Sequence, residues 1–379
     1  MLYGETELCI GLMEINRRYP FRAGARVYPE RSHPPLFNSP LRAGSITMNR
    51  KVIIDTDMGW DDVLSIAYLM KRPDIDIVGI TVTGCGETDL GWGVIIAQHL
   101  LGIGNRLSTV VAKGTDKPLE YDNRFPQPFK NDMNDIMGLL GTLNPAALPA
   151  LSNLPAWEFM YQAVKNSQDK ITVLSLGGFT NIAKMLSLSN QPADFQMIEQ
   201  IVAMAGAVYV DGNVAALNGA QKEWDQGEAY SSNHYAEWNV FVDPVAANTV
   251  FQSSLPLTLV PLDVCNQVIL DASYSQQIKA SDPVATLVRQ VLETKSGTHA
   301  EGYPVPIFDP LATMLMAGGI EATKVDEQFL SVNTNITPQD NHCGQIQLQG
   351  SGSRTITSVL GVSQFAFSKN FAQVINNQV

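Results

Sequence analysis

Four aspartates lie close together in the stretch DTDMGWDD, at positions 55, 57, 61 and 62. Carboxylates at this spacing repel one another, and the repulsion raises their pKa values unless a cation lies among them. A hard cation that prefers oxygen ligands, Ca²⁺ or Mg²⁺, would relieve the repulsion. Acidic residues also cap helix starts, which could account for Asp61 or Asp62 alone but not for four carboxylates at one turn. The spacing therefore predicts a functional site at this turn.

The residues on either side of the aspartates predict how they are held. Residues 52–54 form a short, unbroken apolar run, which is typical of a strand buried on both faces. Val63, Ile66, Ala67 and Met70 recur at helical spacing. The chain is therefore expected to pass from strand to helix through a tight turn at Gly59. Ligands of open α/β sheets bind at the edge where such strands end.

The rest of the chain continues this alternation of strands and helices. Further strands are expected at 76–82, 109–112, 171–176, 198–205 and 257–260. Helices are expected at 90–101, 155–166, 243–251, 272–280, 283–294, 309–318 and 365–376, with long loops at 113–135 and 206–235. This order predicts an α/β fold with an open, mostly parallel, Rossmann-like sheet and flanking helices. Because such connections are right-handed, the loops that carry function gather at one edge.

Composition excludes several classes of protein. The net charge of −12 disfavours binding to a phosphate backbone, so we expect no nucleic-acid partner. No apolar run is long enough to cross a membrane, so we expect no membrane partner either. The four cysteines are scattered without a C-x-x-C pair, which indicates free thiols in a reducing, cytoplasmic compartment and disfavours a zinc site.

Residues 1–47 differ from the rest of the chain. They are rich in arginine and proline and show little periodicity. We expect this segment to be disordered, or to be an extension upstream of a natural start at Met48, although an Arg-rich targeting segment is an alternative. The catalytic domain is then expected to comprise residues 48–379.

Several motifs together carry a resemblance to one family. The stretch DTDMGWDD resembles the D-x-D-x-G-x-D-D signature of the inosine–uridine preferring nucleoside hydrolases. The segment AKGTDKPL resembles their G-x-x-x-P-L motif, Glu237-Trp238-Asn239 their E-x-N motif, and Asp243-Pro244 opens a matching D-P-x-A-A segment. The resemblance extends from about Met48 to the C-terminus.

The resemblance implies a Ca²⁺-dependent hydrolase that cleaves ribonucleosides into ribose and a free purine or pyrimidine base. It implies that Asp57, Asp62 and Asp309 bind Ca²⁺ together with the main-chain carbonyl of Leu176, and that Asp57 also takes the proton of the attacking water. The substrate-binding residues would be Asp61, Glu87, Met204, Asn213, Glu237, Asn239 and Phe308. Many relatives form homodimers or homotetramers, which is the assembly we expect here.

Three features depart from the family pattern. Glu87 stands where several relatives have asparagine or aspartate, and it can still accept a hydrogen bond from a ribose hydroxyl. Phe308 stands where some relatives have a histidine that protonates the leaving base; phenylalanine can only stack on the base, which would leave protonation to His299, Tyr303 or His234. About twenty extra residues separate Asn213 from Glu237; they include Trp224, Tyr230, His234 and Tyr235 and are expected to form a mobile lid.

Two alternatives remain open at this point. A haloacid-dehalogenase-like phosphatase also has a D-x-D motif after a buried strand, but it has Thr or Val at the position of Gly59 and lacks paired aspartates at the helix start. A non-catalytic nucleoside- or ribose-binding protein of the same fold is the other alternative, because Phe308 cannot act as an acid. The retained aspartates at 57, 62 and 309 favour the hydrolase.

Overall fold

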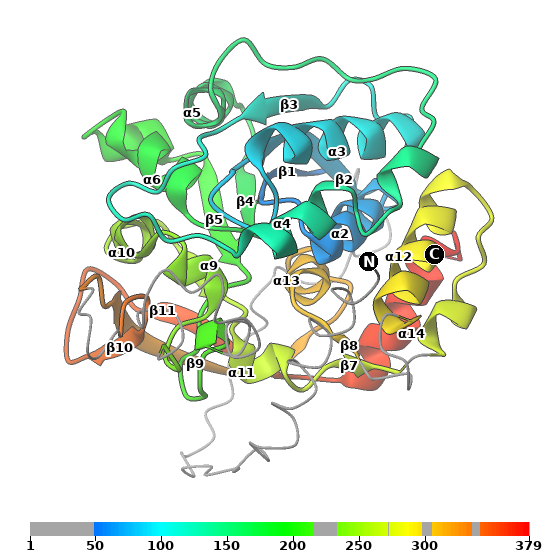
Figure 1. The fold of residues 1–379 in the computed structure, drawn as a ribbon. Helices are drawn as coiled ribbons and strands as arrows, with labels where there is room; N and C mark the ends of the chain where they lie inside the picture. Colours follow the sequence, from blue (N-terminus) through cyan, green and yellow to red (C-terminus); the bar gives the residue numbers. More distant parts are fainter. Residues whose placement is uncertain (1–48, 216–232, 272, 298–304, 336–341, 379) are drawn as a thin grey trace, which may run out of the picture.

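The computed structural model describes residues 49–215, 233–271, 273–297, 305–335 and 342–378. The leader at 1–47, most of the expected lid, and His299 and Tyr303 lie outside these ranges. Within the described residues, nine strands form one sheet in the order β10-β9-β11-β6-β5-β4-β1-β2-β3, and two short strands, β7 and β8, form a second sheet (Figure 1).

The strands begin and end close to the predicted positions. Their bounds are β1 Arg50–Thr56, β2 Ile75–Val82, β3 Val110–Lys113, β4 Ile171–Ser175, β5 Ile198–Ala203, β6 Leu257–Leu259, β7 Ile269–Leu270, β8 Val305–Pro306, β9 Ala322–Val332, β10 Ile346–Gln349 and β11 Ile356–Val362. All pairs from β11 through β6 to β3 are parallel, whereas β9 and β10 add two antiparallel strands at one edge. The prediction of an open, mostly parallel sheet is therefore confirmed.

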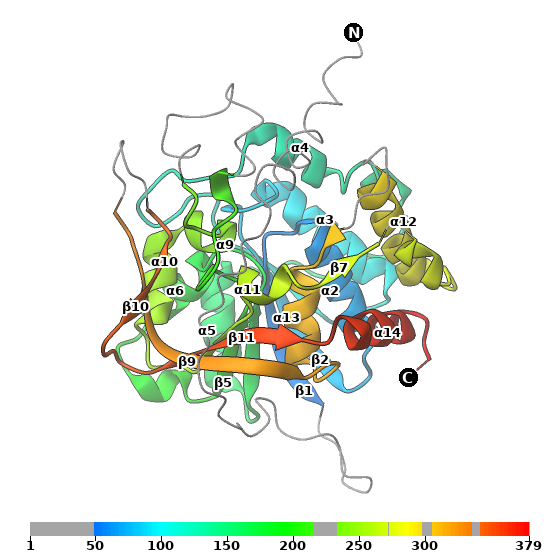
Figure 2. The same ribbon diagram turned by 90° about the horizontal axis from the view of Figure 1, so that it is seen from below.

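Helices cover both faces of the sheet. Their bounds are α2 Trp60–Met70, α3 Leu90–Ile103, α4 Gln127–Asn134, α5 Ala156–Asn166, α6 Thr180–Ser187, α9 Trp238–Phe241, α10 Pro244–Phe251, α11 Leu262–Cys265, α12 Pro283–Gly297, α13 Asp309–Met316 and α14 Gln364–Ile375. Single 3₁₀ turns form at Leu140–Thr142, Pro192–Phe195 and Tyr274–Gln277. Helices α5, α6 and α10 lie on one face, and α2, α3, α13 and α14 lie on the other (Figures 1 and 2).

Alternation along the strands produces two hydrophobic cores. In β1, Val52 and Ile54 belong to the core under α2 and α13, whereas Ile53 belongs to the core under α5 and α6. In β4, Leu174 belongs to the core under α2 and α13, and Val173 belongs to the core under α5 and α6. Because successive side chains of a strand point to opposite faces, an apolar run such as VII can fill both cores at once. The strand ends are thereby fixed from both sides.

Two local predictions were wrong. The segment 113–135, expected to be a loop, contains α4, whose buried Lys130 and Asn134 hydrogen bond to the turn that precedes α3. A helix was expected at 272–280; residue 272 lies outside the described residues, and residues 273–280 contain only the 3₁₀ turn Tyr274–Gln277. The Asp271 carboxylate there accepts hydrogen bonds from the main-chain N–H and hydroxyl of Ser273, and polar side chains that bond locally in this way compete with helix formation.

In the part of the chain that the structure describes, no helix combines the length and apolar character needed to cross a membrane.

Candidate functional site

The turn between β1 and α2 orients the aspartates. Met58 has a φ of 58°, a region that residues with a side chain rarely adopt, and it is buried. The Thr56 hydroxyl donates a hydrogen bond to Asp62 Oδ1, and the Gly59 N–H donates to Asp62 Oδ2 at 2.8 Å. A Cβ atom at Gly59 would lie 2.2 Å from Glu87 Oε2, so a larger residue there would displace the Glu87 carboxylate. The turn thus fixes Asp62 from two sides and leaves room for Glu87.

Three carboxylates meet where α13 begins beside α2. The N–H of Asp309 lies 3.4 Å from Asp61 Oδ2, which brings the starts of the two helices together. Each of Asp61, Asp62 and Asp309 has a carboxylate oxygen within 4.8 Å of an oxygen of the other two, and all three are buried. Residues from distant parts of the sequence therefore form one cluster of oxygen donors.

Asp57 and Glu87 extend this cluster from the adjacent strand end. The N–H of Glu87 donates to Asp57 Oδ2 at 3.1 Å. A Cβ atom at Gly86 would lie 1.8 Å from the same oxygen, and one at Gly177 would lie 2.9 Å from the Asp57 nitrogen. Asp57 is therefore packed between two glycines, while Glu87 Oε2 is buried without a hydrogen-bond partner. An unpartnered acceptor of this kind is costly unless a ligand satisfies it.

Burial and mutual repulsion raise the pKa values of the carboxylates in this cluster. Burial, opposed in part by the hydrogen bond from Glu87, raises the pKa of Asp57 to about 6. Burial, and then repulsion from neighbouring carboxylates, raises the pKa of Asp62, Glu87 and Asp309 well above their ordinary values. These donors are carboxylate oxygens, the ligands that Ca²⁺ and Mg²⁺ prefer. The residues present therefore fit a hard divalent cation.

The ends of β4 and β5 lie next to each other, and the side-chain amide of Asn239 contacts the chain just after both. The N–H of Leu176 donates to the Asp55 carbonyl at 2.7 Å, and the N–H of Met204 donates to the Ser175 carbonyl at 3.0 Å. Asn239 Nδ2 donates to the Met204 carbonyl at 2.9 Å and lies 3.5 Å from the Leu176 carbonyl. Leu176, Met204 and Asn239 are thus brought together beside the end of β1, the strand that Asp57 follows.

Glu237 and Asn213 support the segment that carries Asn239. The Glu237 carboxylate caps α9: it accepts from the N–H groups of Asn239 and Gly206, each at 2.8 Å, and of Val240 at 3.3 Å. Asn213 Oδ1 accepts from the Trp238 N–H at 3.1 Å. Burial raises the pKa of Glu237 to about 7. In the structure, the oxygens of both side chains accept hydrogen bonds from the backbone around α9.

Phe308 directly precedes Asp309 and occupies the N-cap position of α13. Its side chain is partly buried against the core under α2. Of the alternative proton donors, His234 is exposed, and the ring of its neighbour Tyr235 stacks on His342 at 3.9 Å.

Two lysines that lie near the site were not predicted from the sequence. Lys295, on α12, has its Nζ 4.8 Å from the centre of the Trp60 ring, and its charge opposes the raised pKa values of Asp61 and Glu87. Lys130, on α4, is buried and contacts the turn that carries Glu87. Neither lysine lies in a motif, and only long-range packing brings them to the site, so the sequence held no local signal for them.

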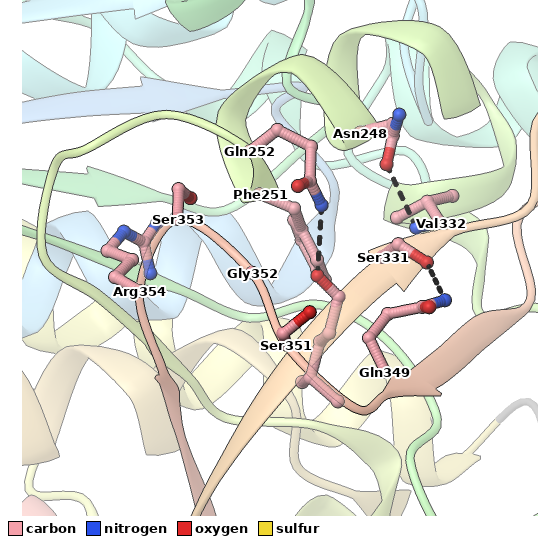
Figure 3. Close-up of a pocket in the computed structure, with 11 residues that line it drawn as sticks. Asn248, Phe251, Gln252, Ser331, Val332, Gln349, Ser351, Gly352, Ser353 and Arg354 are labelled. Carbon is pink, nitrogen blue, oxygen red and sulfur yellow. Dashed lines mark hydrogen bonds between the residues drawn. The ribbon is translucent and has the colours of Figure 1, made fainter.

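A separate hollow of about 310 Å³ lies at the C-terminal end of α10, against β9 and β10 (Figure 3). The hydrogen bonds drawn there join Asn248 to Val332, Gln252 to Leu330 and Gln349 to Ser331. The Arg354 guanidinium donates to the carbonyls of helix α10 and the following turn. None of the predicted site residues lines this hollow, so the predicted chemistry belongs to the carboxylate cluster.

Comparison with known proteins agrees with this geometry. The family described as inosine-uridine preferring nucleoside hydrolase matches residues 52–368. A probable uridine nucleosidase 2 from Arabidopsis thaliana is 30% identical over 71% of this chain and 77% of the relative. A pyrimidine-specific ribonucleoside hydrolase, RihA, from Escherichia fergusonii is 29% identical over 68% of this chain and 76% of the relative.

Solved structures share the fold at lower sequence identity. A plant nucleoside hydrolase superposes with a TM-score of 0.71 and 20% identity, covering 86% of this chain and 99% of the other. A purine-preferring ribonucleoside hydrolase from Gardnerella vaginalis superposes with a TM-score of 0.65 and 21% identity, covering 87% and 99%. Because the family match spans most of the chain and its signature aspartates lie in the buried cluster, this chain belongs to the nucleoside hydrolase family of enzymes.

Proposed function

We propose that this nucleoside hydrolase depends on Ca²⁺ and cleaves both purine and pyrimidine ribonucleosides into ribose and the free base. The observation that carries the metal part is the convergence of Asp61, Asp62 and Asp309, whose carboxylate oxygens lie within 4.8 Å of one another in a buried position. The raised pKa values in this cluster support the same conclusion, because a divalent cation would relieve the repulsion.

We assign the metal ligands to Asp57, Asp62, Asp309 and the Leu176 carbonyl, and we assign Asp61 to a ribose hydroxyl. The closeness of Asp61 to the other two oxygens also fits a role as ligand, so the assignment of Asp61 needs its own test. A bound calcium ion would hold the ribose hydroxyls and the attacking water and would make that water more acidic.

In the reaction, Asp57 would accept a proton from the attacking water. A bound cation would favour the ionised form of this carboxylate, so Asp57 would be able to accept the proton at neutral pH. The transition state of N-ribosidic cleavage resembles an oxocarbenium ion, and the surrounding carboxylates would stabilise its positive charge. Glu87 has a buried, unpartnered oxygen that could accept a hydrogen bond from the sugar.

The remaining assignments concern substrate recognition. Met204, Asn213, Glu237 and Asn239 would line the ribose, and Phe308 would stack on the base. The description of the family as inosine-uridine preferring supports a choice of both base classes, because inosine carries a purine and uridine a pyrimidine.

A substrate panel with and without metal tests the proposal. Purified protein, stripped with EDTA and then supplied with Ca²⁺ or Mg²⁺, is incubated with inosine, guanosine, uridine and cytidine, and the release of ribose is measured. We expect activity only with metal, higher with Ca²⁺, and on both base classes. Full activity in metal-free protein would contradict the metal role. Tight nucleoside binding without ribose release would favour the non-catalytic alternative.

Two variants separate the roles of neighbouring aspartates. Asp62→Asn should lose Ca²⁺ binding and activity together, measured by calorimetric titration and ribose release. Asp61→Asn should keep Ca²⁺ binding within about tenfold and lose substrate affinity. Equal loss of Ca²⁺ binding in both variants would make Asp61 a metal ligand.

Two wider predictions remain to be tested. A homodimer or homotetramer is expected from the family resemblance. A cytoplasmic location is expected from the cysteines, and the buried thiols of Cys85 and Cys265, which form no disulfide, support this expectation.

A further inference from the structure

Helix α4 packs against the turn that carries Glu87. The turn comprises residues 83–89 and joins β2 to α3, and α4 lies beside α3 in both views (Figures 1 and 2). The contacts between α4 and this turn are made by polar side chains rather than by apolar packing alone. They lie on both sides of Glu87.

Lys130 makes the central contact. The residue is only 5% exposed, and its Nζ donates to the Gly84 carbonyl at 3.0 Å. The same Nζ lies 3.3 Å from Asp89 Oδ1. One ammonium group therefore joins the two ends of the turn, at Gly84 and Asp89, with Glu87 between them.

Two further residues of α4 fix the Asp89 end. Asn134 Oδ1 accepts from the Asp89 N–H at 2.8 Å, and Asn134 Nδ2 donates to Asp89 Oδ2 at 2.8 Å. Gln127 Nε2 donates to the same oxygen at 3.0 Å. Because both the backbone and the side chain of Asp89 are engaged, the turn cannot shift without breaking several hydrogen bonds.

The 83–89 turn also holds Asp57 in place. The N–H of Glu87 donates to Asp57 Oδ2 at 3.1 Å, and the Thr88 hydroxyl donates to the Asp57 carbonyl at 2.7 Å. The absence of a side chain at Gly86 allows the backbone to approach this carboxylate. A displacement of the turn would therefore move Glu87 and alter the hydrogen bonds of Asp57 together.

We propose that Lys130 is a positioning residue that clamps the 83–89 turn and thereby sets the places of Glu87 and Asp57 for the reaction. Its link to catalysis rests on the proposed function, whereas its hold on the turn does not. Removing partners that orient the groups around a metal site typically costs about 10- to 100-fold in activity or metal affinity. Lys130 lies one contact further out, because it holds the turn whose Glu87 N–H bonds to Asp57, and we expect a loss of the same order.

The decisive variant is Lys130→Met, which keeps the aliphatic stem and removes both the charge and the donor. Lys71→Met is the matched control: Lys71 is also a largely buried lysine, and it pairs with Asp282 to join α2 to the segment before α12, away from the turn. Both variants should lower Tm. Only Lys130→Met should speed amide hydrogen exchange in a peptide covering residues 83–89, measured by mass spectrometry.

Kinetics provide the second measurement, well below Tm. We expect kcat for inosine or uridine to fall about 10- to 100-fold in Lys130→Met and to stay at the wild-type value in Lys71→Met. Asp89→Asn should show a smaller loss, and the double variant Lys130→Met/Asp89→Asn should lose little more than Lys130→Met alone, because both side chains act through one contact.

Each contrary outcome overturns a defined part of the inference. Unchanged exchange in residues 83–89 of Lys130→Met would show that the lysine does not hold the turn. Faster exchange with unchanged kcat would show that catalysis does not need the turn to be held. Equal losses in Lys71→Met would reduce the effect to general destabilisation. An inactive wild-type protein would refute the proposed function, and the exchange experiment would still decide whether Lys130 holds the turn.

Discussion

Removing the metal should make the stability of this protein depend on pH in a direction opposite to that of most acidic groups. A carboxylate that ionises beside a positive partner normally stabilises the folded state, so the protein becomes more stable as pH rises. Here burial and repulsion raise the pKa of the site carboxylates, so ionisation opposes folding. Metal-free protein should therefore lose stability as pH rises.

The size of the effect follows from the pKa values. Asp57 changes from 3.8 in an unfolded chain to about 6 in the fold, and each pKa unit corresponds to about 1.4 kcal/mol, which gives about 3 kcal/mol. Between these two pH values the folded state binds more protons than the unfolded state, so the free energy of unfolding falls as pH rises. Asp55 and Glu237, with pKa values of about 7, extend the fall to neutral pH.

Calcium should reverse this loss. Saturation at a hundredfold excess over Kd adds about 2.7 kcal/mol to the free energy of unfolding. For a domain of this size, each kcal/mol corresponds to about 2 °C in Tm, so the expected shift is about 5 °C. The assay is a thermal melt at pH 5, 6 and 7, in EDTA and in Ca²⁺.

Asp309→Asn isolates the contribution of the cluster. This substitution removes one buried carboxylate. In EDTA, the Tm of the variant should therefore fall less than the wild-type Tm as pH rises from 5 to 7. It should also lose the Ca²⁺-induced shift. Glu321→Gln removes an exposed carboxylate just after α13 and serves as the control, with no change in either respect. A metal-free wild type whose Tm stays constant or rises from pH 5 to 7 would refute the reasoning, as would a variant that falls further behind wild type over that range.

Three further predictions concern the substrate and the site. A 2′-deoxynucleoside should lose about 100-fold or more in kcat/KM relative to the ribonucleoside, because it leaves buried polar groups unpaired; comparable rates would refute the ribose assignments. Phe308→Ala should lose about tenfold in kcat/KM for each 1.4 kcal/mol of stacking removed, while Phe308→Trp should retain most activity; wild-type rates in both would show that the ring does not touch the base. Lys295→Met should tighten Ca²⁺ binding, measured by calorimetry, because it removes a positive charge that acts on Asp61 and Glu87; weaker binding would indicate that Lys295 helps to hold the cluster.

The sequence predicted the features that depend on local order. The apolar run at 52–54, the turn at Gly59 and the helical spacing after it placed four aspartates at a strand end, and the structure has β1 and α2 there. Strand-and-helix alternation then predicted a parallel sheet, which brings strand ends to one edge. The position of Glu87 near Asp57 follows from the pairing of β1 with β2.

Contacts between distant segments could not be predicted in the same way. Helix α4 was missed because a segment rich in proline and asparagine has weak helical propensity, and its stability comes from side chains that bond to the turn before α3. Lys295 lies on a helix whose face was predictable, but no local pattern shows that this face reaches Trp60. Long-range packing decides such cases.

The double use of the site residues was also invisible in the sequence. The sequence predicted that Asp62 binds the metal and that Glu237 binds the ribose. Their oxygens also accept hydrogen bonds from the backbone, of the turn at Gly59 for Asp62 and around α9 for Glu237. Such bonds fix the side chains before any substrate arrives, which lowers the cost of ordering them on binding. The same bonds occupy acceptor positions that a ligand would otherwise use.

The oxygens that remain open therefore indicate where binding energy is gained. Glu87 Oε2 is buried without a partner beside Gly59, and leaving such an acceptor unpaired costs about 1–3 kcal/mol. A hydroxyl that reaches it recovers that cost, whereas a hydroxyl directed at Glu237 meets a carboxylate already bonded to three N–H groups. Glu87→Gln should then weaken substrate binding more than Asn213→Ala, as the ratio of their KM values would show. The reverse order would mean that the sugar lies closer to α9 than to the turn at Gly59.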